Sequence, residues 1–153
     1  MQIVLETIIA APATVVFSTL VDVGRWAQFM SGIGSVEVLT PGPLAPGTRF
    51  RETRTMFGKT ASEEMMVVEI APPHRLLLAA SNHGTDYRVD HKLATTIDGT
   101  CLSLQFSGTP VTLPARLFAP LGLLFAGSVR KQMDKDLADL KREAERRHRS
   151  GLE

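Results

Sequence analysis

Between residues 36 and 109 the chain consists of short strand-like runs separated by turn residues, and this feature restricts the fold more than any other. The expected strands cover residues 36–40, 49–57, 60–70, 76–81, 86–97 and 100–107. Every connection between the later strands is short, down to the Gly58-Lys59 and Asp98-Gly99 turns. Because strands with short connections pair as antiparallel neighbours, the sequence predicts an antiparallel meander.

Another strand and two short helices are expected before this meander. Residues 2–9 are rich in β-branched side chains and contain no turn residue, which is typical of a strand. Pro12 suits the first turn of a helix that ends near Val21. Asp22 can cap a second short helix that carries Trp26.

The last third of the chain is predicted to form one long helix. Apolar residues recur there at steps of three and four, at Leu121, Phe125, Val129, Met133, Leu137, Leu140 and Ala144. Pro120 lies inside the segment and has no backbone N–H, so we expect a kink or break at that point. These elements predict one α+β domain over residues 1–148, followed by a tail over 149–153.

Composition excludes several other classes of protein. The 153 residues suffice for one core, and 17 basic against 16 acidic residues give no general attraction to nucleic acid. The single Cys101 excludes an internal disulfide, and the four histidines lack metal-ligand spacing, so no metal or cofactor is expected. No apolar run is long enough to span a membrane, and Glu6 interrupts the early apolar stretch. We therefore expect a cytoplasmic protein without stable membrane insertion, as a monomer or homodimer.

Several segments carry a family resemblance. They are IIAAPATVVF at residues 8–17 with Trp26 after it, PGTRF at 46–50, VEIAPPHRL at 68–76, and the Asp98-Gly99 turn. Together with the order of elements, they resemble the START-like (SRPBCC) superfamily, in particular its polyketide cyclase/dehydrase-like branch. The resemblance implies a helix-grip fold, in which a curved antiparallel sheet of about seven strands wraps around the long C-terminal helix. Such a fold encloses an elongated apolar cavity, whose specificity depends on a few polar groups.

Strand alternation predicts which side chains face this cavity. In the strand over 49–57, one face carries Phe50, Glu52, Arg54 and Met56. If this face points inward, Glu52 and Arg54 need each other or a ligand group as a partner, because an unpaired buried charge costs several kcal/mol. The alternative is that this pair lies at an open rim or on the solvated face.

The strand over 86–97 alternates more regularly. Its charged side chains must face water, namely those of Asp86, Arg88, Asp90 and Lys92. This sends Tyr87, Val89 and His91 inward, with Tyr87 and His91 about 13 Å apart along the strand. The phenol and imidazole are candidates for orienting a ligand or for acid–base catalysis, and the alternative is that they are ordinary core residues.

In the strand over 60–70, the face that carries Glu64, Met66 and Ile70 is expected to be the inner one. This adds Glu64 as a catalytic candidate and Met66 as a lining residue. The remaining lining candidates are apolar residues outside that strand, namely Trp26, Phe29, Met30, Phe106, Phe118, Leu121 and Phe125.

The first part of the last helix, which contains Phe118 and Leu121, is apolar nearly all round. A helix of this kind is expected to be buried or to face a ligand. Contact with a membrane is the alternative, and the absence of lysine between Thr112 and Val129 counts against it.

The sequence thus predicts binding of a small hydrophobic ligand, of aromatic, polyketide-like, lipid or isoprenoid type. One alternative is a cyclase or dehydratase in which Tyr87, His91, Glu64 or the Glu52–Arg54 pair moves protons. Another is a protein-interaction module that uses the same groove. The absence of a nucleophile and a base at close sequence spacing favours binding over catalysis.

Overall fold

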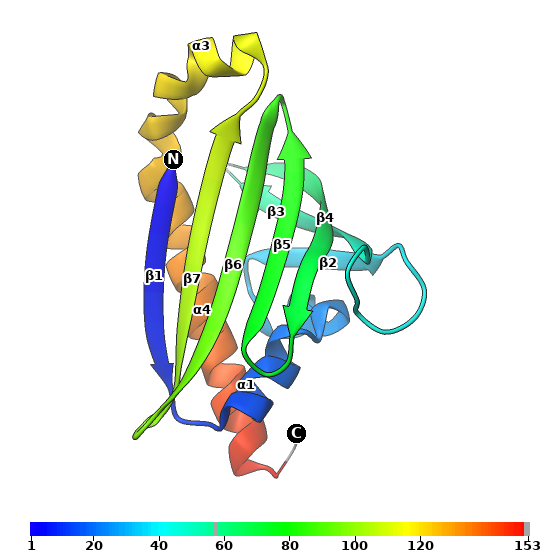
Figure 1. Cartoon of the computed structure of the whole chain (residues 1–153), viewed down its shortest axis with the longest axis vertical. Coiled ribbons are helices and arrows are strands. Elements are labelled where there is room, and N and C mark those ends of the chain that lie inside the picture. Colours follow the sequence, from blue (N-terminus) through cyan, green and yellow to red (C-terminus); the bar gives the residue numbers. More distant parts are fainter. Residues whose placement is uncertain (57, 152–153) are drawn as a thin grey trace.

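Over residues 1–56 and 58–151, which the computed structural model describes, the chain forms a seven-stranded antiparallel sheet and a set of helices (Figure 1). The strands are β1 (Gln2–Ile9), β2 (Ile33–Val38), β3 (Arg49–Met56), β4 (Lys59–Ala71), β5 (Arg75–Asn82), β6 (Thr85–Thr96) and β7 (Gly99–Pro110). The helices after β1 are α1 (Ala13–Leu20), the short 3-10 helix η1 (Val23–Arg25) and α2 (Trp26–Phe29). The chain ends in α3 (Leu113–Gly122), the 3-10 helix η2 (Leu123–Phe125) and α4 (Ala126–Arg149).

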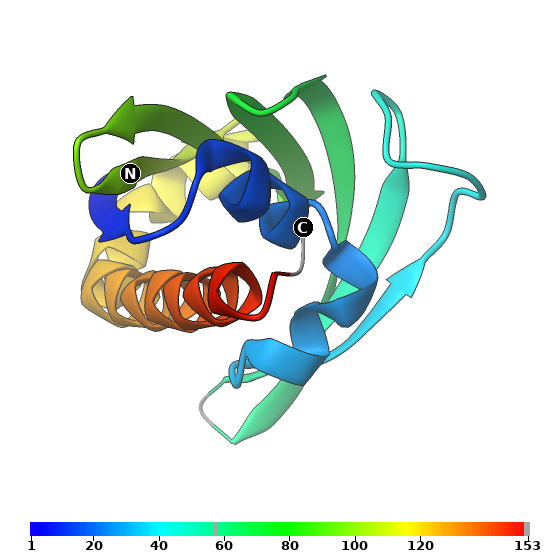
Figure 2. The ribbon, with the colours of Figure 1, turned by 90° about the horizontal axis from the view of Figure 1, so that it is seen from below.

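The order of the strands across the sheet is β1-β7-β6-β5-β4-β3-β2. From β2 to β7 each strand pairs with its neighbour in the sequence, as the short turns predict. The first strand pairs with the last, so that Ile9 lies opposite Thr100. The sheet curves around α4, and α1 and α2 lie across its open side (Figure 2). The predicted helix-grip fold is therefore confirmed.

The predicted long helix is divided into two parts. Thr112 accepts a hydrogen bond from the N–H of Ala115 and caps α3, which ends at Gly122. The break that Pro120 predicts lies just after this helix, where one 3-10 turn leads into α4. As a result α3 lies beyond the end of the sheet, at the top of Figure 1, and α4 runs along the concave face.

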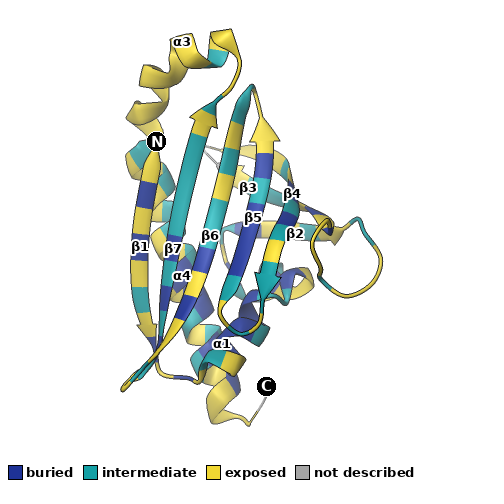
Figure 3. Ribbon diagram, viewed as in Figure 1, coloured by how far each residue is buried: buried dark blue, intermediate teal, exposed yellow. Residues whose placement is uncertain are grey.

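The expectation that the start of this helical region is buried or faces a ligand is wrong for α3. Leu117 is 75% exposed, Phe118 60% and Leu121 54%. The physical reason is the break, which directs α3 away from the concave face, so that no second layer covers it and the helix stays exposed along nearly its whole length (Figure 3).

The hydrophobic core lies between the concave face of the sheet, the short helices and the second half of α4 (Figure 3). Its fully buried side chains include Ile9, Val15, Val16, Leu20, Phe50, Leu76, Leu78, Leu102 and Leu140. Trp26 packs edge-on against Phe50, with ring centroids 5.5 Å apart, and its indole N–H donates to the carbonyl of Leu20 at 3.0 Å. The fully buried part of the core therefore lies where the short helices and the second half of α4 meet the sheet.

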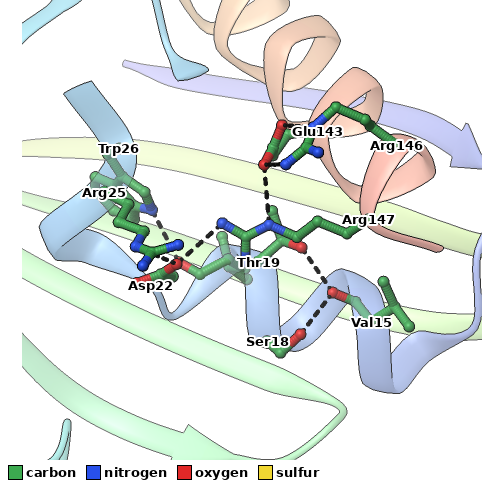
Figure 4. A network of polar contacts seen from close by, with 10 residues as sticks. Val15, Ser18, Thr19, Asp22, Arg25, Trp26, Glu143, Arg146 and Arg147 are labelled. Atoms are coloured by element: carbon green, nitrogen blue, oxygen red, sulfur yellow. Dashed lines mark hydrogen bonds and ion pairs between the residues drawn. The ribbon is translucent and has the colours of Figure 1, made fainter. Parts of the chain in front are cut away.

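Ion pairs fix the end of α4 to this core. Arg147 is buried and donates to Asp22 and to Glu143, each at 3.0 Å (Figure 4). Its guanidinium also lies 5.5 Å from the centre of the Phe29 ring. Hydrogen bonds from Arg146 and Arg147 lower the pKa of Glu143 to about 2, so this carboxylate stays charged at neutral pH. These contacts join α4 to the turn after α1.

Further contacts join α4 to the segments around β1 and α2. Glu145 accepts from the backbone N–H of Ala10 at 2.8 Å, and Lys141 donates to the carbonyl of Ile8 at 2.9 Å. The buried carboxylate of Asp139 accepts from the N–H of Ser31 at 3.0 Å. The second half of α4 is thus held at several points along its length.

Gly99, the first residue of β7, provides a test of how closely β1 packs against the end of the β6–β7 hairpin. It has a φ of 133°, and a Cβ there would lie 2.2 Å from the carbonyl oxygen of Ile9. We predict that Gly99→Ala lowers the free energy of unfolding by at least about 2 kcal/mol, because backbone strain and a backbone clash add. Urea denaturation measures this difference.

Gly42→Ala is the matched control, since Gly42 also has a positive φ, 95°, but has open space around the Cβ position. It should cost about 1 kcal/mol from the backbone conformation alone. Equal losses for the two variants would show that the contact with Ile9 does not matter.

Candidate functional site

A cavity of about 420 Å³ lies between the concave face of the sheet and the last helical segments. Its apolar wall includes Leu20, Trp26, Met30, Met65, Leu78, Ala80, Val89, Leu104, Phe106, Phe125, Val129, Met133, Leu137 and Leu140. The polar side chains along it are those of Glu52, Arg54, Glu63, Asn82, Tyr87, His91, Gln132 and Asp136. This volume lies within the range of pockets that enclose small organic ligands.

Most of the predicted lining residues reach this cavity. They are Trp26, Met30, Glu52, Arg54, Tyr87, Val89, His91, Phe106 and Phe125. The inward face predicted for Tyr87, Val89 and His91 is therefore correct, because the four charged neighbours on β6 leave only one register compatible with burial.

Other predicted residues lie elsewhere. Phe50 is fully buried in the core behind Trp26, and Phe29 packs beneath the guanidinium of Arg147. Phe118 and Leu121 are exposed on α3. The side chain of Met56 lies outside the described part of the chain.

The face predicted for β4 is wrong at Glu64 and Met66. Instead Met65, which is buried, and Glu63 line the cavity, while Glu64 lies outside and pairs with Arg49 at 3.5 Å. The cause is a β-bulge: Val67 pairs with Leu78, but Glu69 pairs with Leu77, so Val68 is an extra residue. The bulge reverses the alternation, and Ile70 can therefore face inward together with Met65.

Arg54 is the centre of a polar cluster on one side of the cavity. Its Nε donates to a carboxylate oxygen of Glu52, and its two terminal nitrogens donate to Asp136 of α4 at 3.2 and 2.7 Å. The amide of Gln132 lies beside the same guanidinium and, with its oxygen turned toward it, accepts from Nε at 3.2 Å. The predicted pairing of Glu52 with Arg54 on the inner face is correct, and Asp136 completes it.

Carboxylates outnumber the cation in this cluster. Glu63 lies opposite Glu52 on the neighbouring strand, and burial, together with the charge of Glu52, raises the pKa of Glu63. Burial also raises the pKa of Asp136, although the hydrogen bonds from Arg54 act in the opposite direction. The cluster therefore combines one paired guanidinium with acids that take up protons more readily than carboxylates in water.

His91 is buried in the middle of β6. Its Nδ1 lies 3.1 Å from the carbonyl oxygen of Leu76. Because a carbonyl only accepts, Nδ1 carries the proton and Nε2 is left as an acceptor. Burial lowers the pKa of His91 to about 4, so the ring is neutral at physiological pH.

Tyr87 lies two residues before Val89 on the same face. Its ring stacks on Phe106 of β7 with centroids 5.6 Å apart. Gly108, its partner across the strands, leaves the space for this ring, since a Cβ there would lie 3.1 Å from it. The phenol is therefore held in a fixed position on the apolar wall.

The sequence interpretation missed Asp136, Gln132 and Glu63. A signal for the first two exists, because Gln132 and Asp136 are four residues apart and adjoin the apolar stripe at Met133 and Leu137. Polar residues at that position on a helix face the edge of the same cavity. Glu63 was missed because the bulge in β4 reverses the alternation, so that an uninterrupted strand pattern predicts the outer face for this residue.

The chemistry open to this site is hydrogen bonding and proton transfer within an apolar enclosure. In the described part of the chain, no group of three or more His, Cys, Asp or Glu residues is arranged to hold a metal ion. Nor does any described helix have the length and apolar character needed to cross a membrane.

The Arg54 cluster gives a prediction about stability. We predict that Arg54→Met lowers the free energy of unfolding at neutral pH by about 2–4 kcal/mol, because it leaves neighbouring carboxylates partly buried without a cation. The loss should be smaller at a mildly acidic pH, because the raised pKa values of Glu63 and Asp136 make their protonation easier. Denaturant unfolding at the two pH values measures both effects.

Arg51→Met is the matched control on the same strand. Arg51 points outward and pairs with Glu37 at 3.1 Å, with both side chains largely exposed, so its loss should cost less than about 1 kcal/mol. If both variants lost a similar free energy of unfolding, Arg54 would behave as a solvent-exposed residue, and the partly buried ion-pair cluster would be contradicted.

His91 gives a prediction about pH. Unfolded chains bind this proton near pH 6.5, but the folded protein binds it only near pH 4, so falling pH in this window favours unfolding. We predict that the contribution of His91 to the free energy of unfolding decreases by up to about 3 kcal/mol across this window. The measurement is the difference between wild type and His91→Gln in urea denaturation at pH 7, 6, 5 and 4.5. A difference that does not change with pH would refute the prediction.

Comparison with known proteins agrees with this geometry. A family model described as "polyketide cyclase / dehydrase and lipid transport" matches residues 1–145. Among curated proteins, none matches the chain.

Solved structures share the fold at low sequence identity. The protein Ara h 8.0201 has a TM-score of 0.71 at 15% identity, covering 94% of this chain and 97% of that one. TTHA0849 from Thermus thermophilus has a TM-score of 0.71 at 17% identity, with the same coverage. The di-domain ARO/CYC StfQ of the steffimycin biosynthetic pathway has a TM-score of 0.79 at 13% identity, over 99% of this chain and 52% of StfQ. With the family model spanning nearly its whole length, the chain belongs to the polyketide cyclase/dehydrase and lipid transport family.

Proposed function

We propose that this protein binds a small, largely apolar ligand in the cavity between the sheet and the last helix. The observation that carries the proposal is the cavity itself, which is apolar over most of its wall and has its polar groups gathered at a few points. Tyr87 and His91 line this cavity, and we expect the phenol and Nε2 to hydrogen-bond two separate polar groups of an elongated ligand. Aromatic, polyketide-like and isoprenoid molecules fit this description.

The Arg54 cluster supports a neutral ligand over a carboxylate. All three nitrogens of the guanidinium already donate to Glu52 or Asp136, so Arg54 has little capacity left to bind a ligand anion. Glu52, Glu63 and Asp136 would repel a carboxylate brought into the cavity. A ligand with hydroxyl groups can instead donate to these acids.

The second candidate is a cyclase or dehydratase, and Glu63 is the observation that favours it. The raised pKa of this acid suits a proton donor at the edge of an apolar cavity. Glu63 thus takes the role that the sequence interpretation gave to Glu64. An enzyme of this kind would convert a linear polyketone into a cyclic product, whereas a carrier would release it unchanged.

Displacement of Nile red, a neutral polarity-sensitive dye, tests the binding proposal. We predict saturable dye binding that 2-naphthol displaces at a concentration at least tenfold lower than 2-naphthoate does. A tenfold ratio corresponds to about 1.4 kcal/mol, a modest value for a carboxylate placed near buried acids. Asp136→Asn should reduce the ratio between the displacing concentrations of 2-naphthoate and 2-naphthol, because it removes one of the negative charges that repel the naphthoate carboxylate.

Two variants on one strand show where the dye binds. Ala80 lines the cavity, and the neighbouring Ala79 points to the opposite face of β5. Ala80→Phe should fill the cavity and weaken dye binding at least tenfold, whereas Ala79→Phe should leave it unchanged. If wild type binds no dye, or if both variants bind it equally well, the cavity is not the ligand site.

A further inference from the structure

The surface of α3 and η2 carries a cluster of exposed apolar side chains. We define the α3 patch as Leu113, Leu117, Phe118, Leu121, Leu123 and Leu124, which are 54–79% exposed. None of the residues of α3 or η2 is buried (Figure 3). A small monomer rarely leaves so many large apolar side chains side by side in water, so a patch of this kind marks an interaction surface.

The segment that carries the patch contains cations but no acidic residue. Between residues 99 and 133 the sequence contains no aspartate or glutamate, but it contains Arg116, Arg130 and Lys131. All three cations are exposed. Arg130 and Lys131 form no ion pair with any described residue, so their charges remain available to a partner. An apolar surface flanked by exposed cations is complementary to a surface that is both apolar and anionic.

The patch adjoins one end of the cavity. Gly122 and Phe125, which belong to the same helical segments, line the cavity, and so does Val129 in the first turn of α4. A partner that covers the patch therefore lies directly beside the cavity. We propose that the α3 patch docks the protein on the surface of anionic lipid bilayers, with the α3 side chains in the interface and the cations at the headgroups.

A second copy of this chain fits the patch less well. In a symmetric dimer the same surface of both copies meets, which would bring Arg116, Arg130 and Lys131 of each copy together. The segment has no acidic residue to neutralise them. The docking is peripheral, since no described helix is long and apolar enough to cross a membrane. It does not depend on the identity of the cavity ligand.

Co-sedimentation with large unilamellar vesicles tests the proposal. One set of vesicles is pure phosphatidylcholine, and the other contains about one third phosphatidylserine. The full chain should bind the anionic vesicles at least tenfold more strongly than the neutral ones, and about 0.5 M salt should remove most of the difference. L117Q/L124Q should reduce binding to anionic vesicles at least tenfold, and R130Q/K131Q at least fivefold.

Ile97→Gln is the matched control. Ile97 is fully exposed in the β6–β7 turn, at the opposite end of the sheet from α3 (Figure 1), so its replacement removes a comparable apolar side chain without touching the patch. This variant should bind anionic vesicles as wild type does. All variants alter exposed side chains, and thermal unfolding should show that they remain folded.

Three results would overturn the proposal. The first is that wild type fails to bind anionic vesicles, or binds neutral ones equally well. The second is that Ile97→Gln loses as much binding as L117Q/L124Q. The third is that sedimentation velocity without lipid shows a dimer which L117Q/L124Q converts to a monomer, because a second copy would then cover the patch.

Discussion

The ion pair between Arg54 and Asp136 joins the sheet to the last helix on one side of the cavity. On the other side α4 packs against β1 and α1, where Lys141 and Glu145 also bind the backbone at the end of β1. With the helix held along both sides, the strands between them arch over a space that neither side chains nor helix fill. The cavity therefore follows from where α4 is attached, and an apolar wall with one polar side is the result.

The same attachment determines the electrostatics of the site. A guanidinium that must leave water needs partners for its N–H groups, and Glu52 and Asp136 supply them from two different elements. With these partners, the guanidinium of Arg54 is paired within the protein. Glu63 lies beside this pair, and burial raises its pKa. The polar side of the cavity is consequently rich in carboxyl groups, although it contains an arginine.

The meander from β2 to β7 and the inward face of β6 were predictable from the sequence, because short connections and four alternating charges each allow one arrangement. The pairing of β1 with β7 does not follow from connection length. The inner face of β4 was not, since one extra residue at Val68 reverses the alternation and leaves no mark in composition. Asp136 was missed because its partner Arg54 lies 82 residues away in the sequence. Local periodicity assigns a residue to one face of its own helix or strand, but it does not identify the residue on another element that it contacts.

The last helical region consists of two parts with different surroundings, since the second half of α4 packs in the core and α3 is exposed to solvent. The second half of α4 contributes Leu137, Leu140 and Ala144 to the core and is held by ion pairs, so its opening requires the loss of much of the buried surface. α3 contributes no buried residue, and its separation from the rest removes little apolar contact. Regions with few buried contacts open at low free-energy cost. The break after Gly122 thus separates α4, which stabilises the core, from α3. Because α3 lies beside the cavity and contributes no buried residue, it can move away from the rest of the protein while the core stays intact.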